Sequence, residues 1–392
     1  MAITVAVLTT FPPTQCGLAT FSHALVRHLE CSGAAVGVVR VVDAEQPDVP
    51  AVVHQWVVGD PRGARGAAAA MDRYDVAIVQ HEYGIFGGAD GADVLEVLDR
   101  VEVPLIVVLH TVLSAPTPHQ HEVLARVVAA ASVVVTMTET ARTRLLAGWS
   151  VDEADVVVIA HGAEDNQPRP SDPPPSSPPV ILTWGLLGEG KGIEWALEAM
   201  AGLADLDPSP RYLVVGETHP RVVEREGEAY RERLHALVRD LGLSDVVRFD
   251  GRYLESAVLR RIVRSADVVL LPYDSRDQVT SGVLTEAVVA GKPVVSTTFP
   301  HAVELLSGGA GLLVPQRDPV AMSAALRRIL VEPGTGARMA ALAREIAPTL
   351  LWSAVADQYL AIGRTLRGAR ASDLRTRARR STPAGGLTRT VA

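Results

Sequence analysis

Two series of buried strands, separated by a proline-rich segment, constrain the fold of this chain most. Residues 3–9 (ITVAVLT) form a continuous apolar run, followed by a Pro/Gly loop and a helical stretch over 19–29. Runs of the same kind recur over 75–80, 104–109, 132–136 and 156–159. Apolar runs that alternate with helices are typical of a parallel sheet covered on both faces. Ligands of such sheets bind at the carboxyl ends of the strands.

A break separates the two series. Residues 167–179 (QPRPSDPPPSSPP) hold seven prolines and predict an extended linker. Strand-like runs then follow over 180–184, 212–215, 246–249, 267–271, 294–297 and 311–314, with helices at about 191–203, 225–241, 255–265, 282–290 and 319–331. We therefore expect an α/β fold with two Rossmann-like domains, over 1–166 and 180–348, which face each other across a deep cleft.

The C-terminal end is rich in arginine. A helix is expected over 349–367, and the remaining residues, 368–392, carry Asp373 as their only acid. This composition predicts a disordered tail. We favour a solvated terminus; the alternative is a peripheral membrane contact with anionic lipid headgroups.

Composition excludes several classes of function. A formal charge of −8 argues against binding to nucleic acid. The two cysteines, Cys16 and Cys31, form no disulfide framework, and no Asp-x-Asp or Cys/His grouping predicts a metal site. The N-terminus lacks the basic region of a signal peptide, and no apolar run reaches about 18 residues. We expect a cytoplasmic protein.

The segment 278–295 (QVTSGVLTEAVVAGKPVV) predicts a ligand site. A polar loop opens into a helix whose first backbone N–H groups suit a phosphate, and Glu286 lies about one turn further in. A carboxylate there can accept hydrogen bonds from a diol such as a ribose. The segment therefore indicates a nucleotide-linked ligand. The alternative is that Glu286 is only a helix residue favoured by the dipole.

Further polar residues follow other predicted strands. Lys191 lies in a glycine-rich loop that is not a Walker A sequence, and His110 ends the strand PLIVVLH. The first loop closes with Gly17, without the GxGxxG of dinucleotide-binding domains. The loop after the strand over 75–80 suggests an acceptor-facing surface, with Glu82 orienting an acceptor hydroxyl and with His81 and Tyr83 beside it.

These features resemble the family 4 glycosyltransferases of GT-B architecture, over nearly the whole chain except the linker and the tail. Within that family the chain looks most like a bacterial mannosyltransferase-like branch. The resemblance is carried by QHEYGIFGG (80–88), HTVL (110–113), HPRVVEREGEAYRERL (219–234) and SGVLTEAVVAGKPVVSTTFPHAVELL (281–306). It implies transfer of a hexosyl group from a nucleotide diphosphate sugar with retention of configuration, without a metal ion or other cofactor.

The resemblance also implies roles for the domains and for single residues. The first domain should bind the acceptor, and the helix near 350–366 should pack back on it. Catalytic roles fall to His110, Gln278 and Glu82, and acceptor binding to His81 and Tyr83. Donor binding falls to Lys191, Arg252, Ser281, Gly282, Val283, Glu286 and Gly17.

The chain departs from the family at two positions. Gln278 stands where the family has the first of two glutamates eight positions apart, which removes a negative charge. Leu186 stands where many relatives have an arginine, and Arg252 is expected to supply part of the missing charge.

The predicted function is transfer of a mannosyl group from GDP-mannose to a sugar, polysaccharide or lipid-linked acceptor; a UDP- or ADP-sugar stays open as donor. A sugar phosphorylase or a nucleotide-sugar epimerase of the same architecture is one alternative. A non-catalytic nucleotide-sugar-binding protein, favoured by Gln278, is the other.

Overall fold

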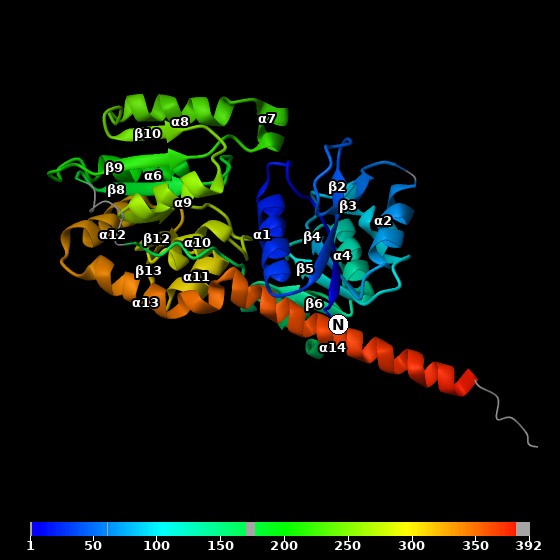
Figure 1. Cartoon of the computed structure of the whole chain (residues 1–392). Helices are drawn as coiled ribbons and strands as arrows, with labels where there is room; N and C mark the ends of the chain where they lie inside the picture. The colour runs from blue at the N-terminus through cyan, green and yellow to red at the C-terminus, as the bar shows by residue number, and fades with distance from the viewer. Residues whose placement is uncertain (1, 61, 170–176, 382–392) are drawn as a thin grey trace, which may run out of the picture.

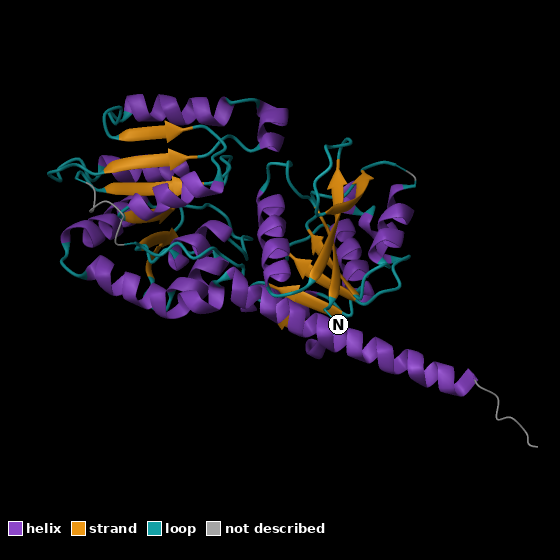
Figure 2. Cartoon of the chain, viewed as in Figure 1, coloured by secondary structure: helices purple, strands orange, loops and turns teal. Residues whose placement is uncertain are grey.

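The computed structural model describes residues 2–60, 62–169 and 177–381, and it contains two α/β domains, each built on a parallel sheet (Figure 1; Figure 2). The first sheet has seven strands in the order β3-β2-β1-β4-β5-β6-β7, and the second has six in the order β10-β9-β8-β11-β12-β13. The two Rossmann-like domains expected from the sequence are thus confirmed.

The first domain alternates strands and helices from the N-terminus. Its strands are β1 (Thr4–Thr9), β2 (Ala35–Val42), β3 (Val52–Val57), β4 (Val76–His81), β5 (Leu105–Leu109), β6 (Val133–Thr136) and β7 (Val156–Val158). Its helices are α1 (Gly17–Cys31), α2 (Gly63–Met71), α3 (Val94–Leu98), α4 (Pro118–Ala130) and α5 (Glu139–Gly148).

The second domain repeats this plan. Its strands are β8 (Val180–Trp184), β9 (Arg211–Val215), β10 (Val247–Asp250), β11 (Val268–Leu271), β12 (Val294–Thr297) and β13 (Gly311–Val314). Its helices are α6 (Ile193–Ala201), α7 (Pro220–Glu226), α8 (Ala229–Asp240), α9 (Ser256–Ser265), α10 (Gly282–Val289), α11 (Pro300–Leu306), α12 (Pro319–Val331) and α13 (Thr335–Leu350). The long helix α14 (Trp352–Ser381) follows.

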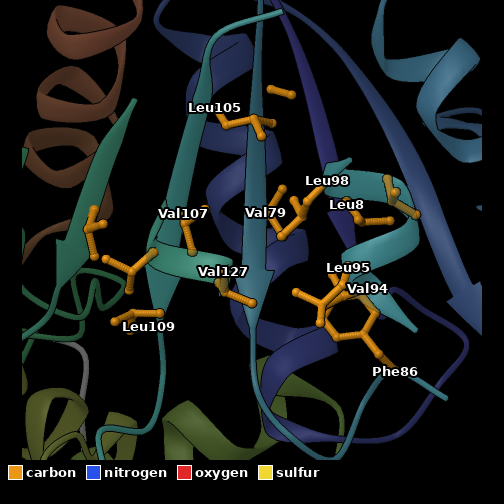
Figure 3. Packing of buried hydrophobic residues seen from close by; sticks show 14 of the residues in the cluster. Leu8, Val79, Phe86, Val94, Leu95, Leu98, Leu105, Val107, Leu109 and Val127 are labelled. Carbon is orange, nitrogen blue, oxygen red and sulfur yellow. The ribbon is translucent and has the colours of Figure 1, made fainter. Parts of the chain in front are cut away.

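Both faces of each sheet are buried, which explains the apolar strands. In the first domain Val7 faces the core under α1 and α14, whereas the next residue, Leu8, faces the core under α2, α3 and α4. Figure 3 shows this second core, where Val79 and Val107 of the sheet pack against Leu95 and other helix residues.

Two strands of the first domain, β2 and β3, were not predicted from the sequence, because polar residues interrupt their apolar runs. The most unusual is Arg40 in β2, which is fully buried. Its guanidinium donates to the carbonyl oxygens of Pro12 and Pro47, each at 2.8 Å. These bonds pair the two terminal nitrogens of a guanidinium that would otherwise be costly to bury in the sheet, while its Nε has no hydrogen-bond partner among the described residues.

The chain passes between the domains twice, and the two passages lie side by side. After the second domain, Leu350 belongs to that domain's core and Trp352 to the core of the first. Ala163, on the way out of the first domain, donates to the Leu350 carbonyl (2.8 Å) and accepts from the Trp352 N–H (3.0 Å). The linker expected at 167–179 lies partly outside the described residues.

The C-terminal helix differs from its predicted length. Trp352 and Tyr359 are buried against the first domain, and α14 lies beside the N-terminus (Figure 1). We placed the start of a disordered tail at 368, but α14 continues to Ser381. The residues 369–381 contain no glycine or proline and are rich in Ala and Arg, so a helix already started by packing can continue through them. Residues 382–392 lie outside the described residues. In the described part of the chain, no helix is long and apolar enough to cross a membrane.

Candidate active site

Helix α10 begins at the carboxyl edge of the second sheet with two unused backbone donors. Ser281 is the N-cap, and its hydroxyl accepts from the Leu284 N–H at 3.3 Å. The Ser281 N–H itself donates to Nδ1 of His301 at 2.8 Å. Among the described residues, the N–H groups of Gly282 and Val283 have no partner, as expected for the first turn of a helix. The structure therefore leaves two of the three predicted amides free for a ligand.

Glu286 lies one turn further along α10, against the end of β8. The Nε1–H of Trp184 donates to the Glu286 carboxylate at 3.2 Å. Burial raises the pKa of Glu286 to about 7. A Cβ on Gly185, the next residue after β8, would lie 3.6 Å from the Val283 side chain. The first turn of α10 and the start of the β8–α6 loop thus meet at one edge.

Lys191 lies in that same loop, between Gly190 and Gly192. Both glycines have positive φ angles (85° and 66°), and a Cβ on Gly192 would overlap the backbone that follows β11. The Lys191 ammonium lies 4.4 Å from the ring centroid of Tyr273, a cation–π contact. The loop of Lys191 and the helix of Glu286 therefore meet at the carboxyl ends of the neighbouring strands β8 and β11.

His110 comes from the opposite domain, directly after β5. Its Nε2 lies 2.7 Å from Oε1 of Gln80 on β4, so with the amide oxygen as acceptor Nε2 carries the proton and Nδ1 is left as an acceptor. Burial, together with the charges of His161 and His81, lowers the pKa of His110 to about 3. His110 is therefore neutral and can act only as a hydrogen-bonding group.

Three more histidines lie around His110: His81 and His301 are buried, and His161 is half-buried. Loss of contact with water lowers the pKa of each, to about 4 for His81 and His161 and to about 3 for His301. The rings of His110 and His161 both lie edge-on to Phe21, at 4.8 and 4.9 Å between centroids. The His161 ring also approaches Gly282 at the start of α10. This cluster connects the acceptor-side histidines with the helix start on the other domain.

The loop after β4 holds the residues predicted to face the acceptor. Glu82 accepts a hydrogen bond from the Thr111 hydroxyl, and burial raises its pKa. Tyr83 donates to the Gln120 carbonyl at 3.3 Å. His81 is fully buried, with neither ring nitrogen hydrogen-bonded, so it lies beneath the loop surface.

Comparisons with known proteins agree with this architecture. Residues 178–332 match the family model described as "Glycosyl transferases group 1". A D-inositol 3-phosphate glycosyltransferase of Kineococcus radiotolerans is 30% identical over 297 residues, which cover 68% of this chain and 67% of the relative. The chain belongs to the group 1 glycosyl transferases. A protein of the same name from Streptomyces bingchenggensis is 29% identical over 292 residues, which are 67% of this chain but only 62% of that relative.

The fold of this group 1 glycosyl transferase is also found in solved structures. Anabaena HepE in complex with UDP and glucose superposes with a TM-score of 0.73 at 17% identity, covering 92% of this chain and 99% of HepE. Sucrose-phosphate synthase from Thermosynechococcus elongatus superposes with a TM-score of 0.72 at 18% identity, covering 94% and 100%. The GT-B fold is thus confirmed, whereas the narrower mannosyltransferase-like branch stays a prediction.

For three of the predicted site residues of this group 1 glycosyl transferase, the contacts in the structure do not by themselves indicate a ligand. Gln278 donates through Nε2 to the Thr280 carbonyl at 3.1 Å, in a loop that contacts the first domain. Arg252 is 76% exposed and forms a two-bond ion pair with Asp250 (2.8 and 2.6 Å), so its charge is already matched. Gly17 begins α1 behind the N-cap Cys16, and a Cβ there would meet nothing within 4 Å.

Sequence reasoning did not name three residues of the site, Trp184, His301 and His161. Their roles depend on partners 20 to 121 positions away along the chain, so no local pattern reveals them. The only local signal was that each follows or ends a buried strand. In the described part of the chain, no group of three or more His, Cys, Asp or Glu side chains could hold a metal ion.

Proposed function

We propose that the protein is a glycosyltransferase that moves a hexosyl group from a nucleotide diphosphate sugar to an acceptor. The second domain binds the donor, and the first domain binds a sugar, polysaccharide or lipid-linked acceptor. The observation that carries this proposal is the meeting of the α10 helix start, Glu286 and Lys191 at one sheet edge. These groups supply donors for a diphosphate and an acceptor for a ribose.

The negative charges of the donor diphosphate would provide the main contacts with the protein. The N–H groups of Gly282 and Val283, the helix dipole and the Lys191 ammonium would bind the diphosphate and stabilise the charge that develops as it leaves. The carboxylate of Glu286, oriented by Trp184, would accept from the ribose hydroxyls. This division of labour needs no divalent cation at the diphosphate.

The reaction step would use few side-chain proton transfers. His110 is neutral, so it would accept a hydrogen bond from a donor sugar hydroxyl through Nδ1. Glu82 would orient the acceptor hydroxyl, while the leaving phosphate takes its proton. We therefore propose transfer on the face of the sugar that the phosphate leaves, which retains the anomeric configuration.

The donor identity and the configuration of the product are open to direct measurement. Purified protein is incubated with GDP-mannose, UDP-glucose or ADP-glucose and a panel of acceptors, and the release of nucleoside diphosphate is followed. Proton NMR of the product reports its anomeric configuration, and EDTA tests the need for a metal. Our expectation is GDP-mannose as donor, although HepE was solved with UDP. The proposal fails if every donor remains intact and unbound.

Gln278 favours a second candidate, a protein that binds a nucleotide sugar without transferring it. The missing carboxylate would weaken stabilisation of a positively charged sugar in the transition state. Tight donor binding without release of nucleoside diphosphate supports this candidate, and measurable transfer eliminates it. Turnover with inorganic phosphate, or without any acceptor, would indicate a phosphorylase or an epimerase.

A further inference from the structure

The segments that follow β8 and β9 carry two cationic side chains, Lys191 and Arg221, and the proposed donor site involves only the first of them. The two loops run side by side, because the Leu187 N–H donates to the Glu217 carbonyl and the His219 N–H donates to the Leu187 carbonyl, each at 2.8 Å. Behind them Val222 of α7 packs against Gly188, where a Cβ would lie 3.1 Å from the valine side chain. This packing brings the residues that follow β9 next to the loop of Lys191.

The positive charges of Lys191 and Arg221 both act on His219 in this place. Burial lowers the pKa of His219, and the positive charges of Arg221, Lys191 and Arg225 lower it further, against the opposing charge of Glu224. Among the described residues, no carboxylate lies within salt-bridge distance of Lys191 or Arg221, whereas the neighbouring Arg231 pairs with Glu228 at 3.3 Å. Neighbouring positive charges repel each other, and an anion bound between them relieves the repulsion.

Arg221, on α7 of the second domain, contacts the first domain directly. Its guanidinium donates to the carbonyl oxygen of Gly84 in the loop after β4, and its charge acts on Glu82 in the same loop. A guanidinium has five N–H donors, and this one hydrogen bond leaves most of them available on an exposed side chain. A ligand group placed here would touch the second domain through Arg221 and the first through Glu82.

We propose that Arg221 and His219, next to Lys191, bind an anionic group carried by the acceptor, so that the acceptor is a sugar or polyol that bears a phosphate or a carboxylate. This inference rests on the proposed function. The donor diphosphate occupies the β8–β11 side of the edge, at the start of α10, whereas Arg221 lies on the β9 side and faces the acceptor loop. A hydroxyl of such an acceptor would reach Glu82, and its anion would take the free donors of Arg221.

The test compares matched acceptors with and without the anion. Glucose 6-phosphate and glucose are offered with the best donor, and kcat/KM is measured for wild type, Arg221→Ala and Arg239→Ala. Arg239 is an exposed arginine in the last turn of α8, at the opposite edge of the sheet, so its variant makes the same charge change outside the cleft. We expect wild type to prefer the phosphorylated sugar. Arg221→Ala should lose 10- to 100-fold with it and less than about twofold with glucose, and Arg239→Ala should match wild type.

Two outcomes would overturn the proposal. An equal loss with both sugars would mean that Arg221 only joins the domains through Gly84. A change confined to the choice between UDP-glucuronate and UDP-glucose would assign the anion to the transferred sugar instead.

A binding measurement separates this proposal from the proposed function. Nucleoside diphosphate is titrated into the protein by calorimetry, and inorganic phosphate is then titrated into the loaded protein. Phosphate should bind to wild type and Arg239→Ala, and at least tenfold more weakly to Arg221→Ala. If the nucleotide binds but phosphate binding is the same in all three proteins, the anion site is wrong and the donor site stands. If the nucleotide does not bind, the proposed function itself fails.

Discussion

Replacing Glu286 with glutamine should stabilise the protein at high pH, because burial disfavours the charged carboxylate more than the Trp184 hydrogen bond and the positive charge of Arg260 favour it. Its pKa rises from the ordinary 4.5 to about 7. Below pH 4.5 the group is neutral in the folded and unfolded chains, and it costs nothing. As the pH rises towards 7, the unfolded chain ionises first, so the folded state loses stability over this window. A pKa difference of about 2.5 corresponds to about 3 kcal/mol, which partial exposure of the residue reduces to about 2–3 kcal/mol.

Glutamine keeps an oxygen for the Trp184 N–H and removes the charge. We expect Glu286→Gln to be more stable than wild type by about 2–3 kcal/mol at pH 8, and by less than about 1 kcal/mol at pH 5. Urea denaturation followed by tryptophan fluorescence measures both differences, and the exposed Glu345 on α13 provides the control variant Glu345→Gln. The same variant should bind nucleoside diphosphate more weakly, since the charged acceptor for ribose is gone. A stability difference that is identical at pH 5 and pH 8 would refute the reasoning.

Three other changes test the site and the domain contact. Lys191→Ala should lower kcat/KM by about 30- to 1,000-fold (about 2–4 kcal/mol) if the ammonium stabilises the leaving diphosphate, and unchanged kinetics would remove it from the mechanism. Gln80→Met should lower stability by about 1–3 kcal/mol and reduce kcat, because it leaves the buried Nε2–H of His110 without a hydrogen-bond acceptor. Full activity would show that the hydrogen bond between His110 and Gln80 does not position the ring. Trp352→Ala should cost about 3–5 kcal/mol in a urea titration, since its ring fills the space over Phe21, and a cost below about 1 kcal/mol would mean that α14 is not held there.

All six strands of the second domain could be predicted from the sequence, whereas its helices α11 and α13, and the strands β2 and β3 of the first domain, were missed. Each strand from β8 to β13 is an apolar run between turn residues, so its position follows from local pattern alone. In β2, by contrast, the charged Arg40 interrupts the apolar run, so the sequence pattern does not indicate a buried strand. Its burial depends on carbonyl groups of Pro12 and Pro47, which the fold brings together from two other loops.

The same distinction holds for the site. Lys191 and Glu286 could be named because each lies in a loop or helix start whose chemistry is local. The partners that orient the site could not, because Trp184 meets Glu286 across 102 positions and His301 meets Ser281 across 20. For Arg252 the local sequence was misleading. Its positive charge was expected to bind a ligand, but the structure pairs it with the carboxylate of the nearby Asp250.

The two crossings of the chain between the domains, which lie side by side near Ala163, also restrict how the domains can move relative to each other. Leu350 is fixed in one core and Trp352 in the other, so on this path Leu351 alone, in an extended backbone conformation (φ −69°, ψ 140°), can absorb a change of angle. A hinge of one residue, hydrogen-bonded on both sides to Ala163 of the other crossing, allows the two domains to bend but hardly to slide or separate. Movement of the two domains relative to each other is therefore expected to follow a single hinge axis through these residues.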